Sequence, residues 1–195
     1  MKPPSLADQK NDLRKWCYNQ RIRIADHEAE SAAQAVAAMV ISIVDVSTRT
    51  IVSAYWPLPG ELDPRPGFVA LGERGATLAL PRTVGDAQPL EFHSWQPQDN
   101  LIEGRFKVME PPSTAARVQP DILLIPLLAF DRYCHRLGHG KGYYDRTLQG
   151  LRSQNPAVLA IGVAFAVQEI EHVPTDANDQ TLDIIITEQD VYRPA

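Results

Sequence analysis

One ten-residue segment, residues 136–145, combines residue types that could bind a phosphorylated ligand. It reads Arg-Leu-Gly-His-Gly-Lys-Gly-Tyr-Tyr-Asp. Alternate glycines leave backbone N–H groups uncovered and permit positive φ, so such a loop can fold closely around an anion. Arg136 and Lys141 add positive charge, and Asp145 supplies a hard oxygen ligand that suits Mg²⁺. The segment predicts a nucleotide-phosphate site; a Gly-rich surface turn with incidental charges is the plainer alternative.

The spacing of these glycines matches neither common nucleotide-binding motif. A P-loop needs two glycines five positions apart, followed by Lys and Ser or Thr, and the dinucleotide fingerprint needs Gly-x-Gly-x-x-Gly. Here the glycines fall at positions 138, 140 and 142. The residues alone therefore indicate an anion site of another type.

Composition and charge limit the classes of partner. The chain has 195 residues, of which 44% are hydrophobic and 22% charged, and we expect one domain covering residues 1–195. A formal net charge of −5 gives no electrostatic support for binding nucleic acid. No apolar run approaches the roughly 20 residues that span a bilayer, and no signal peptide is recognisable. Cys17 and Cys134 lack metal-ligand spacing, and free thiols are typical of the cytoplasm, where we expect this protein.

The elements that must position the glycine loop follow from hydrophobic periodicity. Helices are predicted over residues 6–24, 27–43 and 143–151. On the first of them, Lys10 and Arg14 lie one turn apart and share a face. Apolar and β-branched runs predict short strands at residues 51–56, 76–80, 90–95, 106–109, 121–126, 158–165 and 183–187. Prolines interrupt residues 82–119, which we expect to form loops and edge strands.

Alternating strands and helices indicate an α/β fold. We expect a single three-layer domain with a mostly parallel central sheet and helices on both faces. Ligands bind such sheets at the carboxyl ends of the strands. Three unusual segments should therefore meet in one cleft: residues 56–61, residues 130–145, and residues 174–183 with their carboxylates Asp176, Asp179 and Asp183.

The glycine segment and its surroundings resemble the signature of the 5-formyltetrahydrofolate cyclo-ligases, also called 5,10-methenyltetrahydrofolate synthetases. The resemblance covers essentially the whole chain. Its other carriers, in family order, are Lys10-Asn-Asp-Leu-Arg14, Tyr-Trp-Pro-Leu-Pro-Gly-Glu at residues 55–61, Glu110-Pro111, Leu-Ala-Phe-Asp131, and Val173-Pro174 through Asp179 and Asp183. One departure is Leu127, which stands where the family pattern has glycine.

The resemblance implies an ATP- and Mg²⁺-dependent conversion of 5-formyltetrahydrofolate to 5,10-methenyltetrahydrofolate, with release of ADP and phosphate. ATP would phosphorylate the formyl oxygen, N10 would attack the activated carbon, and phosphate would leave. Such chemistry depends on positioning and charge neutralisation more than on a protein nucleophile. The implied partners are two small molecules, a reduced folate and ATP, with no membrane, nucleic acid or obligate protein partner.

Carried over residue by residue, the resemblance implies three groups of site residues. Lys141 and Arg136 would be catalytic, because they would stabilise charge on the transferring phosphoryl group. The ATP site would comprise Lys10, Asn11, Asp12, Leu13, Arg14, Arg136, Leu137, Gly138, His139, Gly140, Lys141, Gly142, Tyr143 and Tyr144. The folate site would comprise Trp56, Glu61 and Tyr144, and the ligands of Mg²⁺ would be Asp145 and Asp179.

Plainer alternatives stay open for several of these residues. Lys10 and Arg14 could form a solvated basic face. Asp145 could stabilise the start of a helix, Asp179 could form a turn, and Trp56 could pack in the core. A related α/β enzyme that handles phosphosugars or acyl-CoA, or a nucleotide-binding module without turnover, would also use a phosphate loop.

Overall fold

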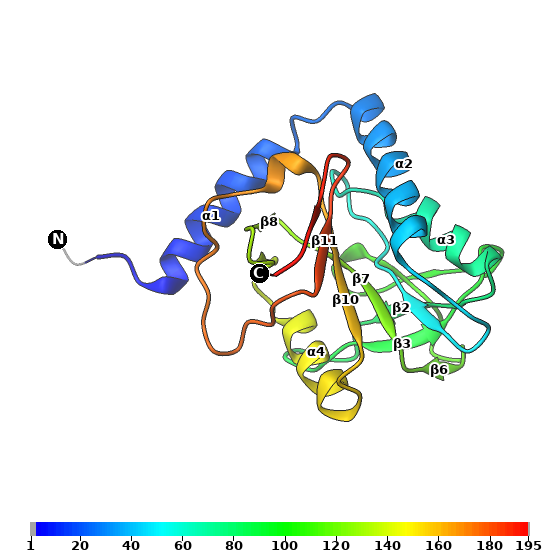
Figure 1. Ribbon diagram of the computed structural model, residues 1–195. Helices are drawn as coiled ribbons and strands as arrows, with labels where there is room; N and C mark the ends of the chain where they lie inside the picture. Colours follow the sequence, from blue (N-terminus) through cyan, green and yellow to red (C-terminus); the bar gives the residue numbers. More distant parts are fainter. Residues whose placement is uncertain (1–2, 195) are drawn as a thin grey trace.

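A mixed eight-stranded sheet, flanked by helices, forms the centre of the computed structural model, which describes residues 3–194 (Figure 1). The larger elements are α1 Leu6–Arg21, α2 Asp26–Ile43, β1 Ile51–Ser53, α3 Arg65–Glu73, β2 Thr77–Arg82, β3 Glu91–Ser94, β6 Arg117–Val118, β7 Ile122–Pro126, α4 Tyr143–Gln154, β10 Leu159–Val163, β11 Ile184–Ile186 and β12 Val191–Tyr192. Two small hairpins pair β4 Ile102–Glu103 with β5 Met109–Glu110 and β8 Ala129–Phe130 with β9 Arg136–Leu137. Within residues 3–194, none of the helices combines the length and apolarity needed to cross a bilayer.

The sheet is mostly parallel, as predicted. Its strand order is β12-β11-β10-β7-β1-β2-β3-β6. The central strands β11, β10, β7, β1 and β2 run parallel, and β12 and β3 flank them as antiparallel neighbours. From β1 the chain moves outward to β2, and it later returns to β7 on the other side of β1. The order of the strands therefore reverses between β1 and β7, which is where open α/β sheets bind ligands.

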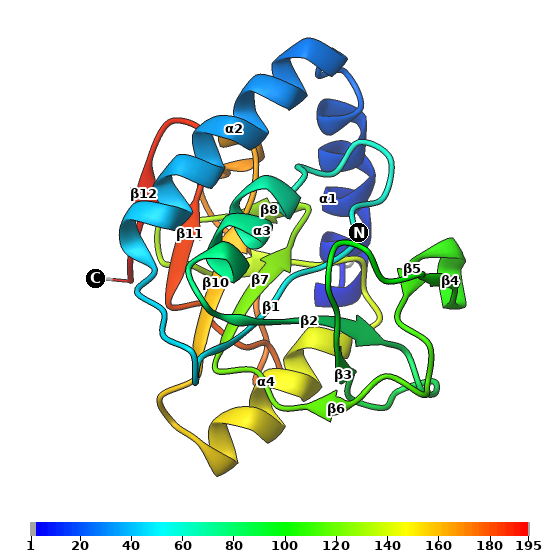
Figure 2. The ribbon, with the colours of Figure 1, turned by 90° about the vertical axis from the view of Figure 1, so that its right-hand side faces the viewer.

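Alternate residues of the central strands face opposite helical layers. In β7, Leu124 belongs to the core cluster that contains Val36 of α2 and Phe68 of α3. Its neighbour Leu123 belongs to the cluster on the other face, which contains Leu148 of α4. Figure 2 shows α2 and α3 on one side of the sheet and α4 on the other. The predicted three-layer arrangement is confirmed.

Helix α1 lies at the edge of this arrangement and packs on the β8–β9 hairpin. It begins with a capping box, in which Ser5 Oγ accepts a hydrogen bond from the Asp8 N–H and the Asp8 carboxylate accepts one from the Ser5 N–H. Its buried residues are Lys10, Cys17 and Arg21. Cys17 packs with the apolar side chains of the hairpin. The inner face of α1 therefore carries two cations.

The structure corrects several predicted elements. No strand spans residues 106–109, because Phe106 and Lys107 have φ of +59° and +60°; a 3₁₀ turn, Arg105–Lys107, precedes β5 instead. The first helix ends at Arg21, and the first strand ends at Ser53. Helix α3 was not predicted, since two glycines and a proline weaken its helical signal. Gly67 allows a close approach of the two helices, because a Cβ there would lie 3.1 Å from the Cα of Ala37 in α2.

Candidate functional site

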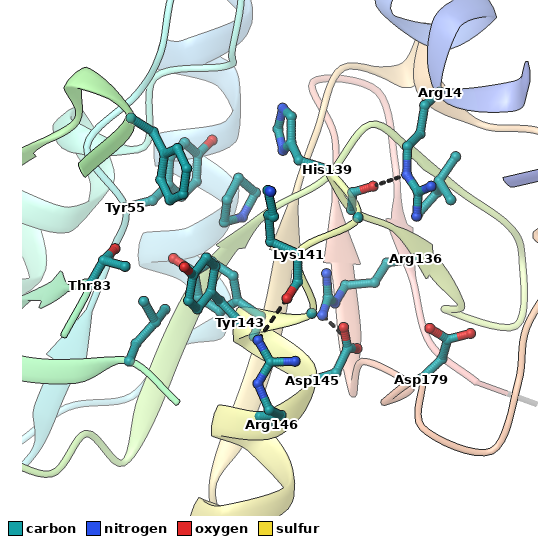
Figure 3. A pocket seen from close by; sticks show the side chains of 18 of the residues that line it. Arg14, Tyr55, Thr83, Arg136, His139, Lys141, Tyr143, Asp145, Arg146 and Asp179 are labelled. Carbon is teal, nitrogen blue, oxygen red and sulfur yellow. Dashed lines mark hydrogen bonds and ion pairs between the residues drawn. The ribbon is translucent and has the colours of Figure 1, made fainter. Parts of the chain in front are cut away.

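A cleft of about 1050 Å³ lies at the carboxyl ends of β1 and β7, and all three predicted segments contribute to its wall (Figure 3). The predicted site residues that line it are Lys10, Asn11, Arg14, Trp56, Glu61, residues 136–145 and Asp179. Asp12 and Leu13 lie outside the wall. The Asp12 side chain is 76% exposed and pairs with Lys15 at 3.3 Å, and Leu13 packs beside Cys17.

The glycine loop is fastened to α1 by Arg14. The Arg14 Nε donates a hydrogen bond of 2.9 Å to the carbonyl oxygen of Gly138, and Asn11 Oδ1 accepts one of 2.7 Å from Arg14 Nη1. Gly140 has φ of +92°, and a Cβ there would lie 2.9 Å from the Arg14 Cζ. The positive φ favours glycine at this position, and a Cβ would also displace the end of the Arg14 side chain. Two segments more than a hundred residues apart thus form one cationic wall.

Arg136 and Asp145 form a largely buried ion pair at the start of α4. The Arg136 Nη2 lies 2.7 Å from Asp145 Oδ1, and the two side chains are 5% and 19% exposed. The same Asp145 oxygen accepts a hydrogen bond of 3.1 Å from the backbone N–H of Gln180. Asp145 also lies in the first turn of α4, where a carboxylate stabilises the helix dipole. The helix-start alternative and a ligand-binding role are therefore compatible.

Lys10 is held by two carboxylates of the loop before β11. Its Nζ lies 2.8 Å from Asp176 Oδ2 and 2.5 Å from Asp179 Oδ2. Burial alone would lower the pKa of Lys10, but the hydrogen bonds to the two carboxylates outweigh it and raise the pKa above its ordinary value. The alternative that Lys10 belongs to a solvated basic face is therefore wrong. Asp179 also forms the predicted turn, since its Oδ2 accepts a hydrogen bond of 2.7 Å from the Asp176 N–H.

The two predicted metal ligands fit a cation whose remaining ligands are water and substrate phosphates. Asp145 and Asp179 both line the cleft, on α4 and on the neighbouring loop (Figure 3). Among residues 3–194, no group of three or more His, Cys, Asp or Glu side chains is arranged to hold a metal ion. Mg²⁺ is commonly bound by one or two carboxylates together with water and substrate phosphates, rather than by an all-protein cage. The donor set is thus adequate for Mg²⁺ bound with a nucleotide.

Glu61, on the segment that follows β1, is a buried carboxylate of the cleft wall. Its side chain is 5% exposed, and its Oε2 accepts a hydrogen bond of 2.9 Å from the Leu58 N–H. Its Oε1 lies 3.7 Å from Arg21 Nη1 and 3.7 Å from His139 Nε2. Burial raises the pKa of Glu61, although the Leu58 N–H and the Arg21 charge act in the opposite direction. The wall therefore offers a fixed hydrogen-bond acceptor beside the glycine loop.

Aromatic side chains flank this carboxylate. Trp56 lines the cleft and also packs edge-on against Trp95, with ring centroids 6.0 Å apart. The Arg65 guanidinium lies over the Trp56 ring at 4.8 Å. Tyr144 lies under the Arg136 guanidinium at 5.8 Å, and burial raises its phenol pKa well above the ordinary value. Trp56 therefore both packs in the core and lines the cleft. Tyr144 lies near both Arg136 and Glu61.

Residues 82–119 supply part of the cleft that the sequence did not reveal. Thr83, Phe106 and Glu110 line the wall, and Thr83 donates its N–H to Glu110 Oε1 at 3.0 Å. The Phe106 ring stands 6.1 Å from the ring of Tyr143 and 6.0 Å from Lys141 Nζ. Only the Glu110-Pro111 pair in the family resemblance pointed to this region. Asp183, in contrast, pairs with Arg152 at 2.9 Å outside the cleft wall.

Comparison with known proteins gives one consistent result. A model of the 5-formyltetrahydrofolate cyclo-ligase family matches residues 7–188. The chain is 31% identical to the 5-formyltetrahydrofolate cyclo-ligase of Escherichia coli over 178 residues, which cover 89% of this chain and 97% of that protein. The corresponding protein of Haemophilus influenzae is 30% identical over 169 residues, with coverage of 84% and 88%.

Solved structures agree with the sequence relatives. The NMR structure of Aquifex aeolicus 5,10-methenyltetrahydrofolate synthetase superposes with a TM-score of 0.80 at 32% identity, covering 94% of this chain and 92% of that one. A 5,10-methenyltetrahydrofolate synthetase from Mycoplasma pneumoniae shares the fold, with a TM-score of 0.73 at 24% identity and coverage of 92% and 98%. By its sequence and its fold, the chain belongs to the 5-formyltetrahydrofolate cyclo-ligase family.

Proposed function

We propose that the cleft converts 5-formyltetrahydrofolate to 5,10-methenyltetrahydrofolate in a reaction that consumes ATP and requires Mg²⁺. The conversion itself follows from family membership. The supporting observation for the two-substrate reaction is that one cleft contains a cationic glycine loop and, next to it, a buried carboxylate with flanking aromatic rings. A cytoplasmic location, a single domain over residues 1–195 and small molecules as the only partners belong to the same proposal.

The triphosphate would lie along α1 and the glycine loop. Backbone N–H groups of residues 138–142 would face its oxygens, and Lys10 and Arg14 would approach from α1. Lys141 and Arg136 would stabilise the negative charge that spreads over the phosphoryl group during transfer. Lys141 suits this role, because its exposed side chain projects from the loop into the cleft (Figure 3).

Asp145 and Asp179 would hold Mg²⁺ beside the phosphates. When bound, Mg²⁺ would neutralise part of the charge on the phosphate oxygens. For this to happen, Arg136 and Lys10 must give up part of their contacts with these carboxylates. Each cation would then pair with a phosphate oxygen, so no buried charge would be left unpaired.

The reduced folate would bind against the part of the cleft wall that contains Glu61 and Trp56, which we call the folate wall. Glu61 would accept hydrogen bonds from the amino and ring N–H groups of the pterin, and Trp56 and Tyr144 would provide flat apolar contacts. The formyl oxygen would then attack the terminal phosphorus and ADP would leave. N10 would attack the activated carbon and lose its proton as phosphate departs. The chain's own contribution is to hold the two substrates in line and to exclude water.

The test follows near-ultraviolet absorbance after the purified protein is mixed with 5-formyltetrahydrofolate, Mg²⁺ and ATP. We expect ATP-dependent formation of the methenyl product, which absorbs where the substrate does not. Lys141→Ala should lower kcat by about 100-fold with little change in folate affinity. Glu61→Ala should weaken folate binding by about tenfold or more. Lys15→Ala, at a side chain 76% exposed outside the cleft, is the matched control.

Two outcomes would contradict the proposal. ATP binding without product would indicate a nucleotide-binding module that lacks turnover. Equal effects of Lys141→Ala and Glu61→Ala on kcat and on folate affinity would contradict the division of the cleft into a phosphate wall and a folate wall.

A further inference from the structure

The Glu61 carboxylate is backed by an arginine that does not reach the cleft. Arg21 closes α1, its side chain is 2% exposed, and its Nη1 lies 3.7 Å from Glu61 Oε1. Among residues 3–194, the Arg21 Nε has no hydrogen-bond partner. Burying a guanidinium with incomplete pairing is costly, and an apolar side chain of similar size would fill the same space at lower cost. The position of Arg21 therefore calls for a reason other than packing.

The two oxygens of Glu61 are held from different directions. Oε2 accepts the Leu58 N–H at 2.9 Å, within a turn closed by the Glu61 N–H bonding to the Leu58 carbonyl at 2.9 Å. Oε1 faces Arg21 and His139, each at 3.7 Å. The Leu58 contact alone would leave the carboxyl plane free to turn. The Arg21 charge behind the wall adds a second restraint and favours the ionised form.

We propose that Arg21 is a positioning residue for the folate wall: from behind the cleft it holds Glu61 oriented toward the pterin, without touching either substrate. This inference rests on the proposed role of Glu61 in folate binding. Arg21 lies on the same helix as Lys10 and Arg14, which would face the phosphates of ATP. One helix therefore sets the charge of both walls.

The groups around Glu61 determine how its binding role should depend on pH. Those that face it are Arg21 from α1, His139 from the glycine loop, Tyr55 from the end of β1 and Tyr144 from α4. Burial, followed by the charges of Arg21 and Arg14, lowers the pKa of His139, so this ring stays neutral at neutral pH. Burial raises the pKa of Glu61 and Arg21 opposes that rise. Removing the Arg21 charge should raise it further, so folate binding should fail at a higher pH on acidification.

The first test measures folate affinity without turnover. For Arg21→Gln, calorimetric titration with 5-formyltetrahydrofolate in the absence of ATP should give about tenfold weaker binding than wild type. The KM for ATP should change by less than about twofold, and the acid limb of kcat/KM for folate should move to higher pH. Arg21→Lys keeps the charge and should recover most of the affinity. Arg23→Gln, at an exposed residue beyond the end of α1, is the control.

A double-mutant cycle separates positioning from a structural role. If Arg21 acts through Glu61, adding Arg21→Gln to Glu61→Gln should change folate affinity by less than about twofold. A further tenfold loss in the double variant would overturn the inference. The double variant also replaces both charges, so it should fold even if Arg21→Gln alone, which leaves Glu61 unpaired, does not.

The remaining outcomes distinguish this inference from the proposed function. Weak folate binding by Glu61→Gln together with normal binding by Arg21→Gln would overturn the role of Arg21 and leave the proposed function intact. Wild-type folate affinity in Glu61→Gln would overturn the role of Glu61 and the inference with it. Absence of product from the wild-type protein would contradict the proposed function itself.

Discussion

Single residues of the cleft pair with partners far away in the chain. Lys10 contacts Asp176 and Asp179, which follow it by 166 and 169 residues. The family resemblance predicted Lys10 as a phosphate-binding residue and Asp179 as a metal ligand. Their contact with each other could not be predicted, because it depends on how α1 docks beside the loop before β11. The assignment of individual roles to these residues stays a prediction.

Gly140 offers the sharpest test at this scale. In Gly140→Ala, a side chain would stand on a backbone with φ of +92°, which is strained, and its Cβ would displace the Arg14 guanidinium, 2.9 Å away. We expect about tenfold weaker ATP binding, measured by calorimetry, because strain of this kind costs about 1–3 kcal/mol. Gly150→Ala is a matched control, since a Cβ there meets nothing within 4 Å inside α4. It should retain ATP affinity; equal losses in both variants would contradict the argument.

Helices and strands were predictable where their hydrophobic pattern is long and regular. Helices α1, α2 and α4 and the central strand β7 lie where periodicity placed them. Helix α3 escaped prediction, because Pro66, Gly67 and Gly72 conceal a helix that is defined by packing against α2 and β2. Its anchor is Phe68, which is fully buried and stacks on Trp95 with ring centroids 5.8 Å apart.

The contribution of α3 can be measured through Phe68. Phe68→Ala should lower the free energy of unfolding by about 3–5 kcal/mol, because it removes a fully buried ring and leaves a cavity between α3 and the sheet. Urea unfolding followed by circular dichroism gives the value. Glu73→Ala, on the exposed side of the same helix, should change it by less than about 0.5 kcal/mol. A loss below about 1 kcal/mol for Phe68→Ala would mean that the ring does not anchor the helix.

For the whole molecule, the order of the strands in the sheet defines where the cleft lies. The parallel order reverses between β1 and β7, and the loops that follow these strands carry Glu61 and the glycine segment. The sequence could predict that these loops meet. It could not predict the wall formed by Thr83, Phe106 and Glu110, because their positions depend on short edge strands and on left-handed turns without a strong local signal.

Ligand binding should stabilise the whole molecule. Lys10 and Arg136 pair with carboxylates, and bound MgATP would offer them stronger partners. At 100 times its Kd, MgATP should add about 2.7 kcal/mol, which corresponds to a rise in Tm of roughly 5–10 °C. Thermal unfolding with and without MgATP measures the shift. Lys141→Ala should reduce it, and an unchanged Tm for the wild-type protein would argue against nucleotide binding in this cleft.

Helix α1 carries Lys10 and Arg14, for which we propose a role in ATP binding, and Arg21, which lies behind Glu61 of the proposed folate wall. The position of α1 therefore affects both proposed binding sites at once. A replacement on its inner face that shifted the helix would disturb both binding sites, because any rotation of the helix moves all three cations together. A substitution of Lys10 would leave Asp179 without its cation, and a substitution of Arg21 would do the same to Glu61, so we expect each to require a second substitution at the partner. Substitutions on its solvent side, where Asp12 and Lys15 lie, should leave both binding sites unchanged.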